Sequence, residues 1–275
     1  MTVTSQRPIL LAGVNLQTLG YNIEVIDGFY GRPGRRGKNR PTPYLDGAYS
    51  YTQKFYEPRR LFLRMGVYAT DADGQVTHSD PFEHLYENLD TLFGLFHSDD
   101  LIPLQRTMGD GATIRQLDVE VLRDTTVTGS TPSSYKFVAE LQAPRPFWKQ
   151  LPVVSTVESG VTGPHAFNIA IGGNAPIGDA KITIDCTSAG SNPSLEIASS
   201  GVFVKYASAM SPGDTVVLDL AERSFTYNGA RADAAIQRNR AWFLRFPPDV
   251  ASLGMAFDAD SGTYNVTIER YNQWF

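Results

Sequence analysis

Short apolar runs recur along most of this chain and alternate with clusters of Gly, Pro, Asn and Asp. The runs are rich in Val, Ile, Thr, Tyr and Phe, residues that suit the pleated, half-buried surface of a β-strand. Such spacing is typical of an all-β sandwich or barrel. We predict strands at 61–68, 116–123, 135–141, 181–186, 215–220 and 264–271. Alternation within the runs is only partial, so the pattern predicts the strands better than their inward faces.

One segment follows a helical period instead. Asp80 can cap a helix that begins at Pro81, and Glu83 stands three residues after that cap. Apolar residues then recur at helical spacing, at Leu85, Leu89, Leu92 and Phe96. We predict one amphipathic helix that begins at Pro81, ends near 94–99 and closes one side of a sheet rather than binding a cofactor.

A change in pattern near 142–164 predicts a division into two domains, 1–150 and 151–275. Four prolines punctuate this stretch around the aromatic pair Phe147 and Trp148. After it, predicted strands follow closely at 177–186, 195–197, 203–206, 215–220, 224–227, 242–246 and 264–271. The pair Asn228 and Gly229 indicates a tight hairpin, since both residues accept positive φ. The second part therefore has the pattern of a β-sandwich.

Composition narrows the function classes. The 275 residues are 42% hydrophobic and 19% charged, with a formal net charge of -5, so nothing attracts the chain generally to nucleic acid or to an anionic membrane. No basic start precedes a sustained apolar run, and no apolar stretch approaches the ~18 residues of a membrane span. We expect neither secretion nor membrane insertion. The single cysteine, Cys186, forms no internal disulfide, which fits synthesis in a reducing cytoplasm.

The most unusual segment, 28–40, carries glycine at every third position from Gly28 to Gly37, and five basic residues lie between and after these glycines. These basic residues are Arg32, Arg35, Arg36, Lys38 and Arg40. A phosphate-binding loop would need a preceding strand, a following helix and a closing Lys-Ser or Lys-Thr, which the segment lacks. We predict a flexible, basic loop that either contacts an acidic surface of a neighbouring subunit or is simply solvated.

Motifs for catalysis or metal binding are missing from the sequence. His78, His84, His97 and His165 do not have zinc-ligand spacing, and the acidic runs 71–74 and 258–262 are incomplete as calcium loops. No Gly-x-Ser-x-Gly elbow occurs. We predict no catalytic, cofactor or metal residues, although a pair of carboxylates brought together by the fold stays open.

Aromatic residues on a sandwich can bind sugars. Trp148, Phe203 and Tyr206 are the candidates for glycan contact, whereas Trp242 lies in a run typical of a core strand.

Several segments, in their order along the chain, resemble the siphophage distal tail proteins. In the first half these are Gly31-Arg-Pro-Gly-Arg-Arg-Gly37, Asp46-Gly-Ala48 and Tyr56-Glu-Pro-Arg-Arg60. In the second half they are Gly173-Asn-Ala-Pro176, Asn192-Pro-Ser-Leu-Glu196, Pro212-Gly-Asp-Thr-Val-Val-Leu-Asp219, Arg223-Ser-Phe-Thr-Tyr-Asn-Gly229 and Trp242-Phe-Leu-Arg-Phe-Pro247. Each is weak alone, but the resemblance covers nearly the whole chain.

The resemblance implies a mainly β, non-enzymatic structural subunit without cofactors. Its N-terminal β-rich domain, with one helix, would form a hexameric ring, and its C-terminal domain would be a galectin-like β-sandwich. The ring would join the tail tube protein to the tail tip hub at the distal end of the virion's tail, and the genome would pass through its channel without being recognised. Arg32, Arg35 and Arg36 are the first candidates for contacts between subunits. The alternative is a receptor-binding or carbohydrate-binding module of the tail tip.

Overall fold

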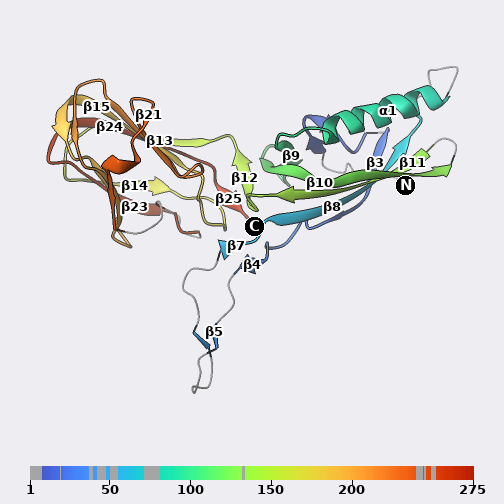
Figure 1. Ribbon diagram of the computed structural model, residues 1–275, viewed down its shortest axis with the longest axis horizontal. Coiled ribbons are helices and arrows are strands. Elements are labelled where there is room, and N and C mark those ends of the chain that lie inside the picture. Colours follow the sequence, from blue (N-terminus) through green and yellow to red (C-terminus); the bar gives the residue numbers. More distant parts are fainter. Residues whose placement is uncertain are drawn as a thin grey trace. The chain divides into compact units, whose positions relative to one another are not determined.

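The computed structural model divides the chain into two compact units, Met1–Trp148 together with Phe275, and Lys149–Trp274 (Figure 1). It describes residues 8–18, 20–36, 40–41, 48–49, 55–70, 81–131, 134–239, 244, 246–248 and 252–275. Strands dominate both units, and the described residues contain one α-helix. The mainly β fold with one helix, expected from the sequence, is confirmed.

The first unit is built on one antiparallel sheet with the strand order β2-β1-β9-β10-β11-β8-β3. Its strands are β1 (Ile9–Leu11), β2 (Val14–Asn15), β3 (Tyr21–Asp27), β8 (Arg59–Tyr68), β9 (Ile102–Thr107), β10 (Ile114–Thr131) and β11 (Ser134–Ala143). The long strand β10 pairs with β9 through its first residues and with β11 from Glu120 onward. In β8 the side chains of Leu61, Leu63, Met65 and Val67 are buried, as the two-residue period of a strand requires.

The helix α1 (Pro81–Phe96) packs on this sheet through the apolar stripe predicted for it. Its four predicted core residues, Leu85, Leu89, Leu92 and Phe96, are all buried. The Phe93 and Phe96 rings contact Phe137 of β11, with centroids 6.0 and 4.9 Å away. The predicted cap, Asp80, lies outside the described residues.

A polar contact also fixes the helix against the sheet. The Asn88 side-chain amide donates to the carbonyls of Tyr68, at the end of β8, and Thr70, at 2.9 and 3.0 Å. The Tyr21 hydroxyl on β3 donates to the Asn88 carbonyl at 3.2 Å. The helix is therefore tied to the two strands β8 and β3 as well as packed against the sheet.

The second unit has two antiparallel sheets. One has the order β13-β24-β15-β19-β20-β21, with β18 beside β15, and the other has the order β14-β23-β16-β17-β22. The first contains β13 (Val154–Val161), β15 (Lys181–Ser191), β18 (Ala209–Met210), β19 (Thr215–Asp219), β20 (Ser224–Tyr227), β21 (Ala230–Arg231) and β24 (Ser261–Arg270). The second contains β14 (His165–Ala170), β16 (Ser194–Ile197), β17 (Val202–Tyr206), β22 (Ile236–Arg238) and β23 (Ser252–Asp258), and the 3-10 turn η1 (Asp233–Ala235) precedes β22.

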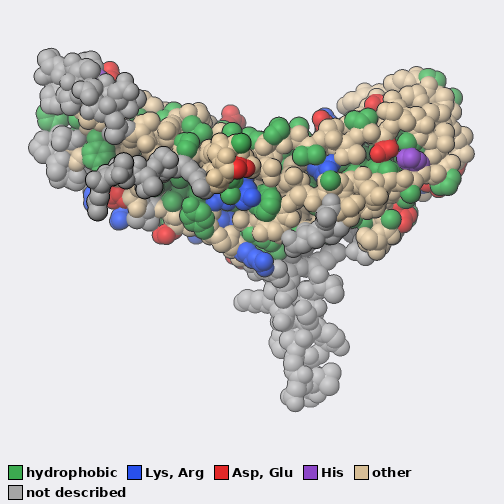
Figure 2. Space-filling view, turned by 180° about the vertical axis from the view of Figure 1, so that it is seen from behind, with side chains coloured by type: hydrophobic (Ala, Val, Ile, Leu, Met, Phe, Trp, Pro, Cys, Tyr) green, Lys and Arg blue, Asp and Glu red, His purple; other side chains and the backbone are tan. Residues whose placement is uncertain are grey.

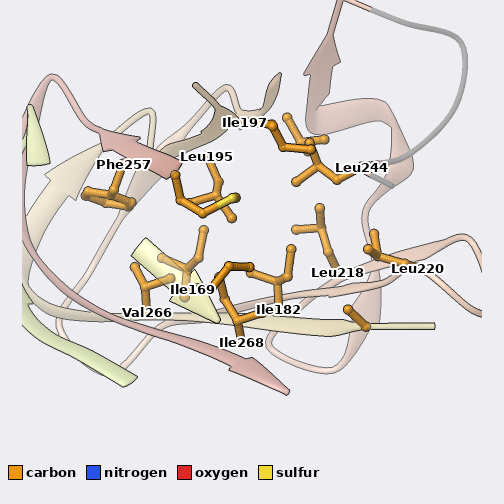
Figure 3. Close-up of a cluster of buried hydrophobic side chains, with 14 of the residues drawn as sticks. Ile169, Ile182, Leu195, Ile197, Leu218, Leu220, Leu244, Phe257, Val266 and Ile268 are labelled. Carbon is orange, nitrogen blue, oxygen red and sulfur yellow. The ribbon is translucent and has the colours of Figure 1, made fainter. Parts of the chain in front are cut away.

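The inner faces of these two sheets enclose one hydrophobic core (Figure 3). Ile182, Leu218, Val266 and Ile268 come from the first sheet, and Ile169, Leu195, Ile197 and Phe257 from the second. Two antiparallel sheets packed face to face form a β-sandwich, so the expected sandwich is present. Cys186 lies in the same core, where burial raises the pKa of its thiol. Its role there is packing rather than reaction.

Local turn chemistry also agrees with the prediction. Asn228 and Gly229 have φ of 48° and 77°, and they join β20 to β21 by a two-residue turn.

The stretch 142–164, where the domain boundary was predicted, contains two strands. They are β12 (Trp148–Leu151) and β13, separated by Pro152. The prolines lie between strands or before them, where no ladder N–H is lost, and therefore do not break the sheets. Near the chain end, β25 (Gln273–Trp274) lies beside β12. The backbone N–H of Gln150 donates to the backbone carbonyl of Asn272 at 2.9 Å.

Candidate subunit-contact site

Part of the basic segment of the first unit is paired backbone. The short strand β4 (Arg35–Arg36) pairs with β7 (Phe55–Tyr56), and β5 (Arg40–Pro41) pairs with β6 (Ala48–Tyr49). Both pairs are antiparallel, and we call the short strands β4 to β7 together the basic hairpin. Lys38 and the side chains of Arg35, Arg36 and Arg40 lie outside the described residues.

A buried arginine anchors the chain just before this hairpin. Arg59 is only 4% exposed, and its guanidinium donates to four backbone carbonyls. Nε donates to Pro146 at 2.9 Å, and the other nitrogens donate to Gly28 at 2.9 Å, Phe29 at 3.3 Å and Gly31 at 3.0 Å. Burial lowers the pKa of Arg59. The fork of donors thus joins the segment 28–31 to the segment before Trp148.

Glycine is required where this segment crosses β8. Gly28 has φ of +77°, and a Cβ there would lie 2.0 Å from the Arg60 carbonyl oxygen. Any other residue would push the segment away from the strand that carries Arg59.

Next to this anchor, Arg106 lies among three aromatic rings. Its Cζ is 4.2 Å from the centroid of Trp148, 5.1 Å from that of Phe29 and 5.6 Å from that of Tyr30. Phe29 and Trp148 also meet edge to face, with centroids 4.9 Å apart. A guanidinium over aromatic faces is held by cation–π attraction, which grows as water is excluded. We call Arg106, Phe29, Tyr30 and Trp148 the Arg106 cluster.

Burial and neighbouring arginines dominate the electrostatics of Arg106, against a smaller opposing effect of Tyr30. Burial, and after it the positive charge of Arg115 across the β9–β10 pair, lower the pKa of Arg106 to about 10. Arg59 acts in the same direction. Arg106 still carries its charge at neutral pH, and it forms no ion pair with any residue that the structure describes. The cluster is therefore a local concentration of positive charge on an acidic chain.

A second contact between arginine and aromatic residues involves the chain end. The Arg32 guanidinium lies 4.8 Å from the ring centroid of Phe275. The rings of Tyr56, Phe147 and Phe275 contact one another, with centroids 5.0 to 5.6 Å apart. Among the five predicted contact residues, the structure describes the side chain of Arg32 alone. That side chain is exposed and precedes the hairpin.

The predicted glycan-contact aromatics are not brought together. Trp148 is fully buried in the Arg106 cluster, and Tyr206 is 7% exposed in the core of the second unit. Phe203, on β17, is half-buried. Buried rings offer no face to a sugar, so Trp148 and Tyr206 do not support a carbohydrate platform. Trp242 lies outside the described residues.

The residues weighed for metal binding also have other surroundings. In the described part of the chain, no group of three or more His, Cys, Asp or Glu side chains is placed to hold a metal ion. The run 258–262 forms the turn between β23 and β24, which belong to different sheets. Glu269 stands at the closing position of a calcium loop counted from Asp258, but it pairs with Lys181 near the far end of β24. It therefore cannot close a calcium loop. The run 71–74 and His78 lie outside the described residues.

The face drawn in Figure 2 carries both basic and acidic side chains. On the face drawn in Figure 2, Lys and Arg side chains occur in small groups rather than over one continuous area. Among the described residues, no helix has both the length and the apolar character that crossing a bilayer needs.

Comparison with known proteins finds phage tail components that are similar to this chain. Residues 172–274, which form most of the sandwich, match the family described as "Siphovirus-type tail component, C-terminal domain". The C-terminal part of the chain is therefore similar to that family's domain. No curated protein matches the sequence significantly.

Among solved structures, the fold is similar to that of SPP1 Dit, described as a paradigm of hub adsorption apparatus in Gram-positive infecting phages. The TM-score is 0.67 at 13% identity, covering 97% of this chain and 99% of that chain. A chain of the phage p2 baseplate in its activated conformation with Sr is also similar, with a TM-score of 0.48 at 8% identity, over 95% of this chain and 98% of that chain. The resemblance to siphophage distal tail proteins is confirmed by the family domain together with the fold.

Arg59, Arg106, Phe29 and Tyr30 were missed as site residues from the sequence, and Trp148 was named only as a candidate for glycan contact. The one local signal was Phe29 and Tyr30 between two glycines, directly before the basic residues.

Proposed function

We propose that this protein is a structural distal tail protein of a long-tailed bacteriophage. In this proposal the first unit assembles into a hexameric ring that joins the end of the tail tube to the tail tip hub. The partners are further copies of this chain, the tail tube protein and the hub protein. The protein acts at the distal end of the virion's tail after synthesis in the host cytoplasm, and it has no catalytic role.

The observation that carries this proposal is the combination of the family domain at 172–274 with a fold similar to SPP1 Dit over almost the full length. The arginine-rich site of the first unit supports it physically. A closed ring needs two different complementary surfaces on each subunit. Arginine suits such surfaces because its planar fork binds carboxylates in a bidentate manner.

The basic hairpin gives the first test. Arg35→Glu on β4 should weaken assembly, because it reverses one charge of a surface proposed to meet an acidic neighbour. Arg231→Glu is the matched control, since it makes the same charge change on an exposed site of the second unit. Native mass spectrometry of the chain alone, and mixed with the tail tube and hub proteins, measures the assembly.

We expect wild type and Arg231→Glu to form a six-subunit species and Arg35→Glu to shift toward monomer. A wild-type chain that stays monomeric with both partners, and binds host envelopes instead, would support the receptor-binding alternative.

A further inference from the structure

The Arg106 cluster contains buried hydrogen-bond donors that lack an acceptor. Trp148 is fully buried, and its indole Nε1 has no partner among the described residues. The same holds for Nε of Arg106. Buried donors are normally paired, because an unmade bond leaves the cost of removing the group from water uncompensated. Both atoms are closed off from solvent, so a group of another molecule can reach Arg106 only at the rest of its half-buried side chain, whose charge has no partner in the described part of the chain.

The cluster is also accessible from outside. Arg106 is half-buried, whereas Tyr30 beside it is 77% exposed. An exposed ring next to a partly desolvated arginine has the composition found at the centres of protein interfaces, where Tyr and Arg are enriched. The chemistry that fits is a carboxylate, which accepts several hydrogen bonds and neutralises the guanidinium.

The chain itself carries a matching acidic site. Asp99 and Asp100 are exposed between α1 and β9, and neither carboxylate forms an ion pair with another described residue. Leu101 beside them is 50% exposed, so an apolar contact accompanies the two charges.

These two sites cannot meet within one molecule. Asp100 precedes β9 and Arg106 lies near its end, so the extended strand holds them about 20 Å apart at its usual rise per residue. Complementary sites at different places on one subunit are what a head-to-tail assembly requires.

We propose that the Arg106 cluster receives the Asp99–Asp100 carboxylates of a neighbouring copy of this chain. This contact rests on the proposed function, because it requires a homo-oligomer, and it is separate from the basic hairpin. Tyr30 and Leu101 supply the apolar rim of the same contact.

Charge reversal at the exposed acidic site is the first experiment, since Asp99→Lys with Asp100→Lys should leave the fold intact. The control is Asp27→Lys with Asp90→Lys, which makes the same charge change at two other exposed positions of the first unit. Analytical ultracentrifugation over a concentration series measures the assembly midpoint. We expect the midpoint to rise about ten-fold or more in the first variant only. Adding Arg106→Glu to that variant should recover much of the loss.

A cross-link keeps the test independent of the folding of an Arg106 variant. Tyr30→Cys and Asp100→Cys proteins are mixed and oxidised, while the buried Cys186 stays unreactive. Disulfide-linked dimers should form in the mixture and not with Asp27→Cys in place of Asp100→Cys.

The outcomes separate the two proposals. This contact is overturned if the Asp99→Lys, Asp100→Lys variant assembles normally. It is also overturned if the Tyr30→Cys and Asp100→Cys proteins assemble without the specific cross-link. The proposed function still stands in both cases. A wild-type chain that never self-associates, with or without tail partners, overturns both.

Discussion

Replacing Arg59 with methionine tests whether the buried guanidinium holds the first unit together. Methionine keeps much of the length and apolar contact of the side chain but removes every donor. Two of the carbonyls that Arg59 serves, those of Phe29 and Pro146, are reached by buried hydrogen bonds. Each buried acceptor left unpaired costs about 1 to 3 kcal/mol, so the two together should lower the free energy of unfolding of Arg59→Met by about 2 to 6 kcal/mol.

Arg60→Met is the matched control. Arg60 is the next residue on β8, but its side chain is 74% exposed and its one ion pair, with Glu140, spans 3.9 Å. An exposed pair of this kind contributes about 0 to 1 kcal/mol. Equilibrium unfolding in urea, monitored by tryptophan fluorescence and circular dichroism, compares the two variants. Equal stabilities, within about 0.5 kcal/mol, would refute the anchoring role of Arg59.

Three further predictions concern the second unit. Gly173→Ala should destabilise more than Gly213→Ala in thermal melts: both have positive φ, which costs alanine about 1 to 2 kcal/mol, but only at Gly173 would a Cβ lie 2.0 Å from a backbone oxygen, that of Gln273. Equal losses would contradict this. Hydrogen bonds from the Tyr227 hydroxyl, and to a smaller extent from Asn228 and the Ser211 backbone N–H, lower the pKa of Asp214 below 3.8. The stabilisation that the ionised Asp214 gives the fold should therefore be lost as the pH falls below 3.8 toward that lower pKa. Asp214→Asn should remove this part of the acid dependence, and an unchanged acid profile would count against it. The hydrogen bond to Asp214, followed by burial, raises the pKa of Tyr227 to about 12. The contribution of Tyr227 to the free energy of unfolding is therefore complete below pH 10 and lost as the pH rises to 12. Tyr227→Phe should flatten that alkaline loss, and an identical slope would refute the assignment.

Local signals predicted the elements whose determinants are close in sequence. The stripe from Leu85 to Phe96 defined α1, because four apolar residues at helical spacing can be buried together only as a helix. The Asn228 turn was predicted for a similar reason, since both of its central residues tolerate positive φ.

Strands with prolines nearby or with partial alternation were harder to predict. β12 and β13 were hidden by Pro152, which lies between them, and β10 proved longer at both ends than the predicted 116–123. Its continuation past Glu120 depends on pairing with β11, a tertiary effect.

The Arg106 cluster could not be predicted from the sequence. Its members come from positions near 29, 106 and 148, and only the antiparallel order of the sheet brings them together. Arg59 was missed because arginine is rarely fully buried without a charged partner, whereas here backbone carbonyls take that place.

We propose that this chain forms the ring at the end of a phage tail. Negative-stain imaging of the purified chain with its tail tube and hub proteins tests this proposal most directly. We expect class averages of a six-fold ring with a central channel, bound to the tube protein on one side and the hub protein on the other. A stable monomer that binds neither protein would contradict the account.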